Sequence, residues 1–114
     1  PAVPFDPARL RQALLNLVRN AVEAAGQSGT VRVGAHATKS GLRVTVEDTG
    51  PGIPAAARER LFEPFFTTKP SGTGLGLLLA REIILEHQGE LSVEGSGLGG
   101  AAFHVDLPGP SAAP

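Results

Sequence analysis

The length, charge and cysteine content of this chain exclude several classes of protein. Its 114 residues suffice for one domain with a real core but not for two. The formal net charge of −1 creates no field that would attract nucleic acid or an anionic membrane, and no apolar run approaches the roughly 20 residues of a membrane span. The absence of cysteine excludes disulfide bonds and thiolate metal sites and fits a reducing compartment.

The first part of the chain predicts one long helix followed by a β-hairpin. Asp6 and Pro7 are a typical N-cap and first helical residue, apolar residues then recur at helical spacing, and Gly26 ends the run. Residues 31–38 and 42–47 alternate apolar and polar side chains on either side of a short turn. This pattern predicts two paired strands.

The second part predicts a long loop, another helix and two more strands. Residues 54–60 favour a short helix, whereas residues 61–74 have no periodicity and are rich in Pro, Gly, Thr and Phe, as in a functional loop. Apolar residues cover most of a helix over 74–87, so we expect it to be buried on more than one side. Residues 91–94 and 101–107 alternate as strands do. The order predicts an α+β fold, with helices on one face of a mostly antiparallel sheet.

Asp48 lies at the end of an apolar row. Side chains alternate along a strand, so Asp48 shares the face of Val44 and Val46. A carboxylate on a core face is costly unless something donates hydrogen bonds to it. The residues alone leave the donor open.

Asn16 and Asn20 are four residues apart on the polar face of the first helix. Asparagine is unfavourable inside a helix, and a merely solvated face would more often carry Glu, Lys or Gln. Either the two asparagines are tolerated there, or their amide oxygens face a hard cation. Magnesium prefers oxygen ligands and takes few of them from protein when phosphates and water supply the rest.

Gly72, Gly74 and Gly76 form a glycine-rich stretch before the second helix. Glycines let backbone N–H groups approach a phosphate, and a helix start adds its positive end. The spacing differs from that of a P-loop and from the dinucleotide fingerprint. A plain flexible hinge is the alternative.

Three of the five phenylalanines fall within five positions, namely Phe62, Phe65 and Phe66. Each aromatic side chain can bury roughly 150–250 Å², so we do not expect all three to be exposed to water. They are expected to fill the core, to form a movable cover or to dock a partner.

These stretches, in this order, resemble the catalytic, ATP-binding domain of bacterial sensor histidine kinases. That family belongs to the GHKL superfamily, which also includes DNA gyrase, the MutL repair proteins and heat-shock chaperones. Residues 6–21 resemble the N box with its lead-in, 48–52 the first glycine box, 61–69 the F box and 72–77 the second glycine box. The segments Arg-Asn-Ala-Val-Glu-Ala and Phe-Thr-Thr-Lys look most like those of the nitrogen- and oxygen-sensing kinases.

The resemblance implies a two-layer α/β sandwich of the Bergerat type, with a mixed, mostly antiparallel sheet. The ATP-binding domain would span residues 6–108, between a linker remnant at 1–5 and a tail at 109–114. With ATP and Mg²⁺, it would phosphorylate a histidine on a separate dimerisation domain, which would pass the group to a response-regulator receiver domain. Alone it would be an incomplete protein-histidine kinase and a monomer, whereas the full kinase would be a homodimer in the bacterial cytoplasm, with or without a membrane anchor.

The resemblance also implies roles for particular residues. Asn20 would be the magnesium ligand, Asn16 would lie beside the phosphates, and both would count as catalytic. Asp48 would accept a hydrogen bond from the adenine 6-amino group, and residues between 52 and 72 would form the ATP lid. The implied nucleotide-binding residues are Asn16, Arg19, Asn20, Asp48, Gly50, Gly52, Ile53, Phe66, Thr68, Lys69, Gly72, Thr73, Gly74, Leu75, Gly76 and Leu77.

Three positions depart from the family pattern. Glu23 stands where many members carry a phosphate-facing lysine, and Arg19 or Lys69 would have to supply that charge. Ala101 replaces a threonine whose hydroxyl helps hold adenine. Asn16 stands where gyrase-like relatives place a water-activating glutamate; an amide cannot accept that proton, which disfavours vigorous hydrolysis.

No histidine of this chain has the setting of a phosphoacceptor, and we expect His36, His87 and His104 to be solvated. An anti-sigma-type serine kinase of the same superfamily remains an alternative, which the presence of an upstream histidine-bearing hairpin would decide. A second alternative is a degenerate docking module, but the intact Asn20, Asp48 and glycines argue against it. A third is an unrelated α/β domain, and the four ordered motifs argue against that.

Overall fold

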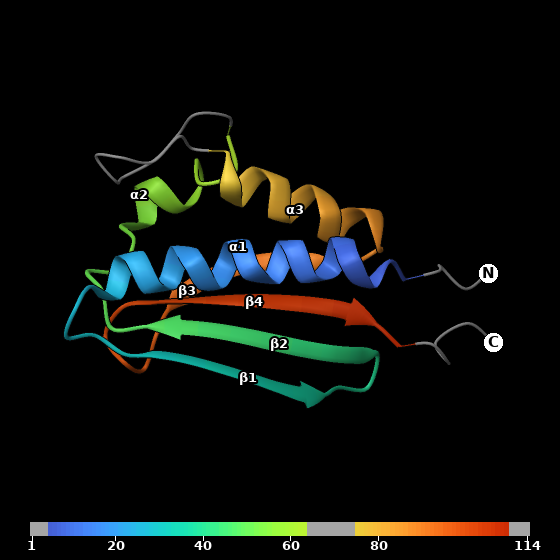
Figure 1. Cartoon of the computed structure of the whole chain (residues 1–114), viewed down its shortest axis with the longest axis horizontal. Coiled ribbons are helices and arrows are strands. Elements are labelled where there is room, and N and C mark those ends of the chain that lie inside the picture. Colours follow the sequence, from blue (N-terminus) through green and yellow to red (C-terminus); the bar gives the residue numbers. More distant parts are fainter. Residues whose placement is uncertain (1–4, 64–74, 110–114) are drawn as a thin grey trace.

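The chain folds into two layers, a four-stranded sheet and a layer of helices on one of its faces (Figure 1). The computed structural model describes residues 5–63 and 75–109. Its elements are α1 (Pro7–Ala25), β1 (Val31–Ala37), β2 (Gly41–Asp48), α2 (Ala55–Arg58), α3 (Gly76–Glu86), β3 (Glu90–Gly95) and β4 (Ala101–Pro108). The strands of the sheet lie in the order β1-β2-β4-β3, and each pairing between them is antiparallel. The predicted α+β two-layer class is confirmed.

Helix α1 begins and ends where its sequence predicts. The Asp6 carboxylate accepts hydrogen bonds from the N–H groups of Ala8 and Arg9 at 3.1 and 3.2 Å, and proline follows at the first helical position. At the other end, Gly26 adopts a φ of 74° and donates its N–H to the Val22 carbonyl. The termini of α1 are therefore determined locally.

The core lies between the helices and the sheet. Its buried apolar residues are Ala13, Leu17, Ala21, Val44, Val46, Leu61, Ala80, Ile83, Ile84, Ala101, Phe103 and Val105. Helix α1 packs over β2 and beside α3, and α3 packs over β3 (Figure 1). Helix α3 is thus buried on more than one side, as predicted. No helix in the described ranges is long and apolar enough to cross a membrane.

Several element boundaries differ from the prediction by one or two residues, and the residue after α3 in the left-handed region is not a glycine. Helix α2 covers only Ala55–Arg58, and α3 starts at Gly76 rather than at residue 74. After α3, the left-handed residue is Gln88, with a φ of 61°. Gly89 is needed for another reason, because a Cβ atom there would lie 2.6 Å from the Asp106 carbonyl oxygen of β4.

His87 corrects a prediction, because it is buried rather than solvated, with 4% of its surface exposed. Its Nε2 accepts the Asp6 N–H at 3.0 Å, so its Nδ1 carries the proton and donates it to the Ile83 carbonyl at 2.8 Å. Phe5 contacts the imidazole edge-on at 5.7 Å. His87 therefore connects the start of α1 to the end of α3.

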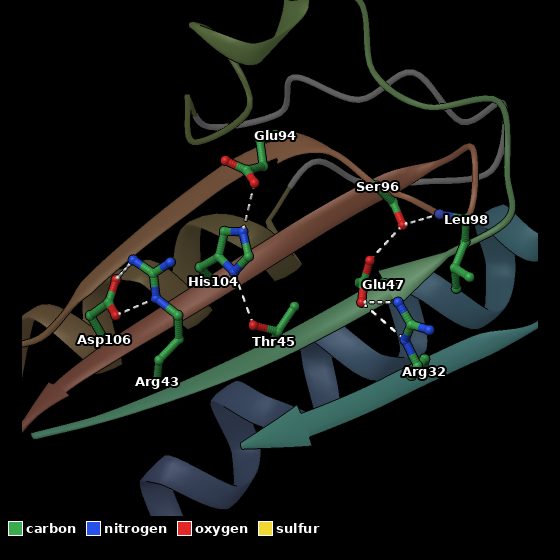
Figure 2. A network of polar contacts seen from close by, with 9 residues as sticks. All are labelled: Arg32, Arg43, Thr45, Glu47, Glu94, Ser96, Leu98, His104 and Asp106. Atoms are coloured by element: carbon green, nitrogen blue, oxygen red, sulfur yellow. Dashed lines mark hydrogen bonds and ion pairs between the residues drawn. The ribbon is translucent and has the colours of Figure 1, made fainter. Parts of the chain in front are cut away.

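The sheet face opposite the helices carries polar contacts between strands (Figure 2). Arg43 binds Asp106 through Nε–Oδ1 at 2.7 Å and Nη2–Oδ2 at 3.0 Å. Glu47 accepts hydrogen bonds from Ser96 and Arg32. These contacts join β2 to both of its neighbours and to the turn after β3.

His104 lies among these contacts, and its side chain is only 13% exposed. Its expected solvation is therefore wrong as well. Its Nδ1 is 3.0 Å from the Thr45 hydroxyl, and its Nε2 lies 3.2 Å from Glu94 Oε1, within ion-pair distance. That approach lacks hydrogen-bond geometry, and within the described ranges Nε2 has no other partner.

Replacement of His87 tests its role as a connector. We expect His87→Leu to lower the free energy of unfolding by about 1–3 kcal/mol, since it leaves the Asp6 N–H without its acceptor. Denaturant unfolding measures the change. The control is His36→Leu, at an exposed position of β1; equal effects of both substitutions would contradict the role.

The ion pairs on the sheet face opposite the helices predict that the free energy of unfolding depends on pH. The hydrogen bond from Arg43 lowers the pKa of Asp106 below its ordinary 3.8, and those from Ser96 and then Arg32 lower the pKa of Glu47 below 4.5. A carboxylate whose pKa is lower in the folded state contributes stability that is present above its unfolded pKa and is lost as pH falls through its folded pKa. We therefore expect Arg43→Gln to be destabilising at neutral pH and the difference from wild type to shrink below about pH 3.8.

Unfolding midpoints measured from pH 7 down to pH 3 give this difference. Lys39→Gln, in the exposed turn between β1 and β2, is the control, because it removes the same charge from a residue that has no ion pair within the described ranges. A difference for Arg43→Gln that is constant over this range would contradict the assignment.

Candidate functional site

Asp48 ends β2 as a buried carboxylate, with 1% of the residue exposed. Its Oδ1 accepts the N–H of Gly50 at 2.8 Å and the N–H of Ala101 at 3.3 Å. The second donor comes from the start of β4, 53 residues further along the chain. The sequence left the donor open, and for Oδ1 the donors are main-chain groups near the ends of two adjacent strands.

The other carboxylate oxygen has no such partner. Asp48 Oδ2 is inaccessible to water and accepts no hydrogen bond within the described ranges. Leaving a buried polar group unsatisfied costs about 1–3 kcal/mol, and more for a charged one. The arrangement suits a bound molecule that brings its own hydrogen-bond donor, such as the amino group of a base.

Glycines allow the main chain to pack tightly around this carboxylate. The N–H of Gly100 donates to the Asp48 carbonyl at 3.1 Å, and a Cβ atom on Gly100 would collide with Asp48 Oδ1. A Cβ on Gly50 would lie 2.5 Å from the Ala24 carbonyl oxygen near the end of α1. Gly52 adopts a φ of 76°, where glycine is favoured. Gly100 was absent from the predicted site. The feature of the sequence that could have indicated it is a glycine directly before the last predicted strand.

The structure brings the asparagine face of α1 to the start of α3. Asn16 donates its Nδ2–H to the Gly76 carbonyl at 3.4 Å, across 60 residues of sequence. Asn20 lies one turn further along α1, toward Ala24 and the Gly50 turn. Both asparagines are half-buried. Along α1, the contact with Gly76 of the predicted second glycine box therefore comes first, then Asn20 of the N box, and then the contact with Gly50 of the first glycine box.

Helix α3 begins without a polar capping side chain, since Leu75 occupies the N-cap position, and its first turn contains no acidic residue. The N–H groups of a helix's first turn have no intrahelical acceptors, and the helix dipole is positive there. A Cβ atom on Gly76 would meet no heavy atom within 4 Å. The chemistry of this helix start therefore suits an anion such as a phosphate.

The remaining predicted residues divide into two groups. Ile53 and Leu77 are half-buried against the core, and the Ile53 carbonyl accepts the Arg58 Nε–H at 3.0 Å. Arg19 and Leu75 are exposed. Phe65 and the part of the predicted lid after residue 63 lie outside the described residues, as do Phe66, Thr68, Lys69, Gly72, Thr73 and Gly74.

The structure describes the phenylalanine-rich stretch as far as Glu63. Leu61 is buried in the core, and Phe62 packs against that core. The Arg81 guanidinium of α3 lies 5.5 Å from the centre of the Phe62 ring, within range of a cation–π contact. For Phe62, the interpretation as core filling is supported.

No group of three or more His, Asp or Glu side chains suited to a metal occurs in the part of the chain that the structure describes. Mg²⁺ does not require such a group, because it is commonly held by one or two protein oxygens together with water and phosphate. The Asn20 amide is compatible with such a site.

The chain is similar to known proteins over nearly its whole length. Residues 5–111 match the family model described as "Histidine kinase-, DNA gyrase B-, and HSP90-like ATPase". Over 108 residues, the chain is 44% identical to the sensor histidine kinase ZraS of Escherichia coli O157:H7, covering 95% of this chain but only 24% of ZraS.

Solved structures of histidine kinases share the fold. The nucleotide-free catalytic domain of histidine kinase ThkA superposes with a TM-score of 0.83 at 42% identity, over 93% of this chain and 70% of that one. Histidine kinase ThkA in complex with the response regulator protein TrrA superposes with a TM-score of 0.79 at 37% identity, over 93% of this chain and 30% of that one.

The chain therefore belongs to the family of histidine kinase-, DNA gyrase B- and HSP90-like ATPases. Within that family, its similarity is to the catalytic ATP-binding domains of sensor histidine kinases.

Gly100 provides a test of the packing around Asp48. We expect Gly100→Ala to lower the free energy of unfolding by about 1–3 kcal/mol and to weaken ADP binding, because the added methyl group displaces the carboxylate. Gly97→Ala is the matched control, since a Cβ there meets nothing within 4 Å. Denaturant unfolding and calorimetric titration measure both quantities. If the two variants behave alike, Gly100 is not required for this packing.

Proposed function

We propose that this domain binds Mg-ATP and supplies the γ-phosphoryl group for autophosphorylation of a histidine on a separate dimerisation domain of a two-component kinase. The observation that carries the proposal is the buried Asp48 Oδ2, which lacks a donor within the described ranges. The adenine 6-amino group is such a donor. Guanine presents an acceptor at that position, which a carboxylate repels, so the site favours ATP over GTP.

Each part of the site would contact a different part of the nucleotide. Asp48 would bind the base, and the turn of Gly50 and Gly52 would allow close approach to it. Asn16 and the start of α3 would lie beside the phosphates, with Asn20 as the protein ligand of Mg²⁺. When bound, Mg²⁺ neutralises phosphate charge. The family resemblance implies that Gly72, Gly74 and Gly76 line the triphosphate, and Arg19 or Lys69 would supply the positive charge that Glu23 does not.

Phosphoryl transfer, rather than hydrolysis, follows from the chemistry of α1. An asparagine amide cannot accept a proton from water, so Asn16 cannot act as a general base. Positioning and charge neutralisation provide most of the catalysis in phosphoryl transfer. The domain alone should therefore hydrolyse ATP slowly.

The partners follow from the family. The histidine on the dimerisation domain would pass its phosphoryl group to the aspartate of a receiver domain, and the kinase ThkA with its response regulator TrrA is a precedent for such a complex. The full kinase would be a homodimer with this domain, residues 6–108, in the bacterial cytoplasm, where ATP is available. Its resemblance to nitrogen- and oxygen-sensing kinases stays a prediction.

Titration of this chain with ATP, ADP and GTP, with and without Mg²⁺, tests the proposal. We expect binding of ATP and ADP, weak or no binding of GTP, and tighter ATP binding with Mg²⁺. Asn20→Ala should reduce the gain from Mg²⁺ by at least about tenfold, because metal neutralisation of charge is worth several kcal/mol. Gln12→Ala, at an exposed position of α1 one turn before Asn16, is the control.

Absence of binding to any adenine nucleotide by the folded chain would overturn the proposal. An unchanged Mg²⁺ effect in Asn20→Ala would overturn only the assignment of the metal ligand.

A further inference from the structure

Helices α1 and α3 lie side by side, and hydrogen bonds join them at both ends of α3 (Figure 1). At the end of α3, His87 Nε2 accepts the N–H of Asp6, the N-cap residue of α1, at 3.0 Å. At the start of α3, the Gly76 carbonyl accepts the Nδ2–H of Asn16 at 3.4 Å. The two helices therefore run in opposite directions and are held to each other at two separate points.

The two hydrogen bonds are about equally far apart along both helices. At a rise of 1.5 Å per residue, position 16 lies about 15 Å along α1 from position 6, and position 87 lies about 16 Å along α3 from position 76. Both bonds therefore fit one axial position of α3 against α1. A shift of α3 along its own axis would strain both bonds together.

The imidazole of His87 is well suited to hold this axial position. The residue is 4% exposed, and its Nδ1–H donates to the Ile83 carbonyl of α3 at 2.8 Å, which fixes the ring on its own helix. Arg9 and Glu86 also join α1 to α3 at this end, but their side chains are 42% and 53% exposed. Exposed ion pairs between long side chains constrain little. The rigid contact at this end is therefore that of His87.

We propose that the hydrogen bond from Asp6 to His87 sets the axial position of α3 on α1 and thereby holds the start of α3 beside Asn16 for the phosphates of the nucleotide. His87 is then a positioning residue, one helix length away from the phosphates. Asp48, which would bind the base, belongs to the sheet, so a displaced α3 should weaken phosphate binding and spare the base. This inference rests on the proposed nucleotide site.

Two amide variants separate the two hydrogen bonds of the imidazole. The glutamine amide reaches the position of Nε2 and can accept the Asp6 N–H, whereas the shorter asparagine amide reaches the position of Nδ1 and can bond only to Ile83. We expect the ratio of ADP affinity to adenosine affinity to stay as in wild type in His87→Gln and to fall at least about threefold in His87→Asn. The interaction of an anion with a helix start corresponds to roughly 2- to 30-fold in affinity.

Calorimetric titration with ADP, and competition with adenosine, measure this ratio. A variant that is merely less stable but still folded would bind both ligands in the wild-type ratio. Arg9→Gln is the matched control, because it removes the exposed ion pair between the same two helices at the same end. We expect it to leave the ratio unchanged.

Wild-type protein provides a reciprocal test, because coupling between two sites acts equally in both directions. Saturating ADP should slow hydrogen exchange of the Asp6 N–H at least about threefold more than saturating adenosine does. Exchange followed by NMR measures the difference. The control is the Thr38 N–H, which donates to the Gly41 carbonyl in the turn between β1 and β2 and should exchange equally with either ligand.

The outcomes distinguish this inference from the proposed function. If wild type does not bind ADP, the proposed function is wrong. If wild type binds ADP, the inference is overturned when His87→Gln and His87→Asn give the same ratio, or when Arg9→Gln lowers the ratio as much as His87→Asn. Equal protection of the Asp6 N–H by ADP and adenosine also overturns it. Should the His87 variants not fold, as judged by circular dichroism, the exchange experiment on wild type decides.

Discussion

The hydrogen bonds from Gly50 and Ala101 to Asp48 Oδ1 are the contact on which the site depends. They join the end of β2, the turn after it and the start of β4 around one carboxylate that is closed to water. The absence of a side chain at Gly100 makes this approach possible. Because both donors belong to the main chain, they hold the carboxylate in one orientation, in which Oδ2 has no partner among the described residues.

The two faces of the sheet have different roles. The helix-covered face holds the apolar core and, at one end, the Asp48 carboxylate, with α1 extending from there to the start of α3. The opposite face joins neighbouring strands through ion pairs such as Arg43–Asp106 and Arg32–Glu47 (Figure 2). Exposed pairs of this kind contribute little each, but they favour one strand register. Register matters here, because a slip of β4 against β2 would remove the Ala101 donor from Asp48.

Sequence reasoning succeeded where the relevant interactions are local and failed where they are distant. Alternation predicted the β1–β2 hairpin, and the apolar coverage of α3 predicted its burial. His87 was expected to be solvated, yet Asp6, 81 residues away, donates to it. The acceptance of the Ala101 N–H by Asp48 was missed for the same reason, since no pattern in a strand reveals which backbone group will face its last side chain.

By itself, the sequence determined the termini of α1, the alternating strands, the glycines at turns and the types of residue available to a nucleotide and a metal. These depend on short-range geometry, because capping, periodicity and φ preferences act within a few residues of the chain. Only the tertiary structure decided that β4 lies between β2 and β3, that Asn16 meets Gly76, and that the described residues satisfy one oxygen of Asp48 but not the other. The packing of the helices on the sheet fixes those distances, so they follow from the whole core and not from any single stretch.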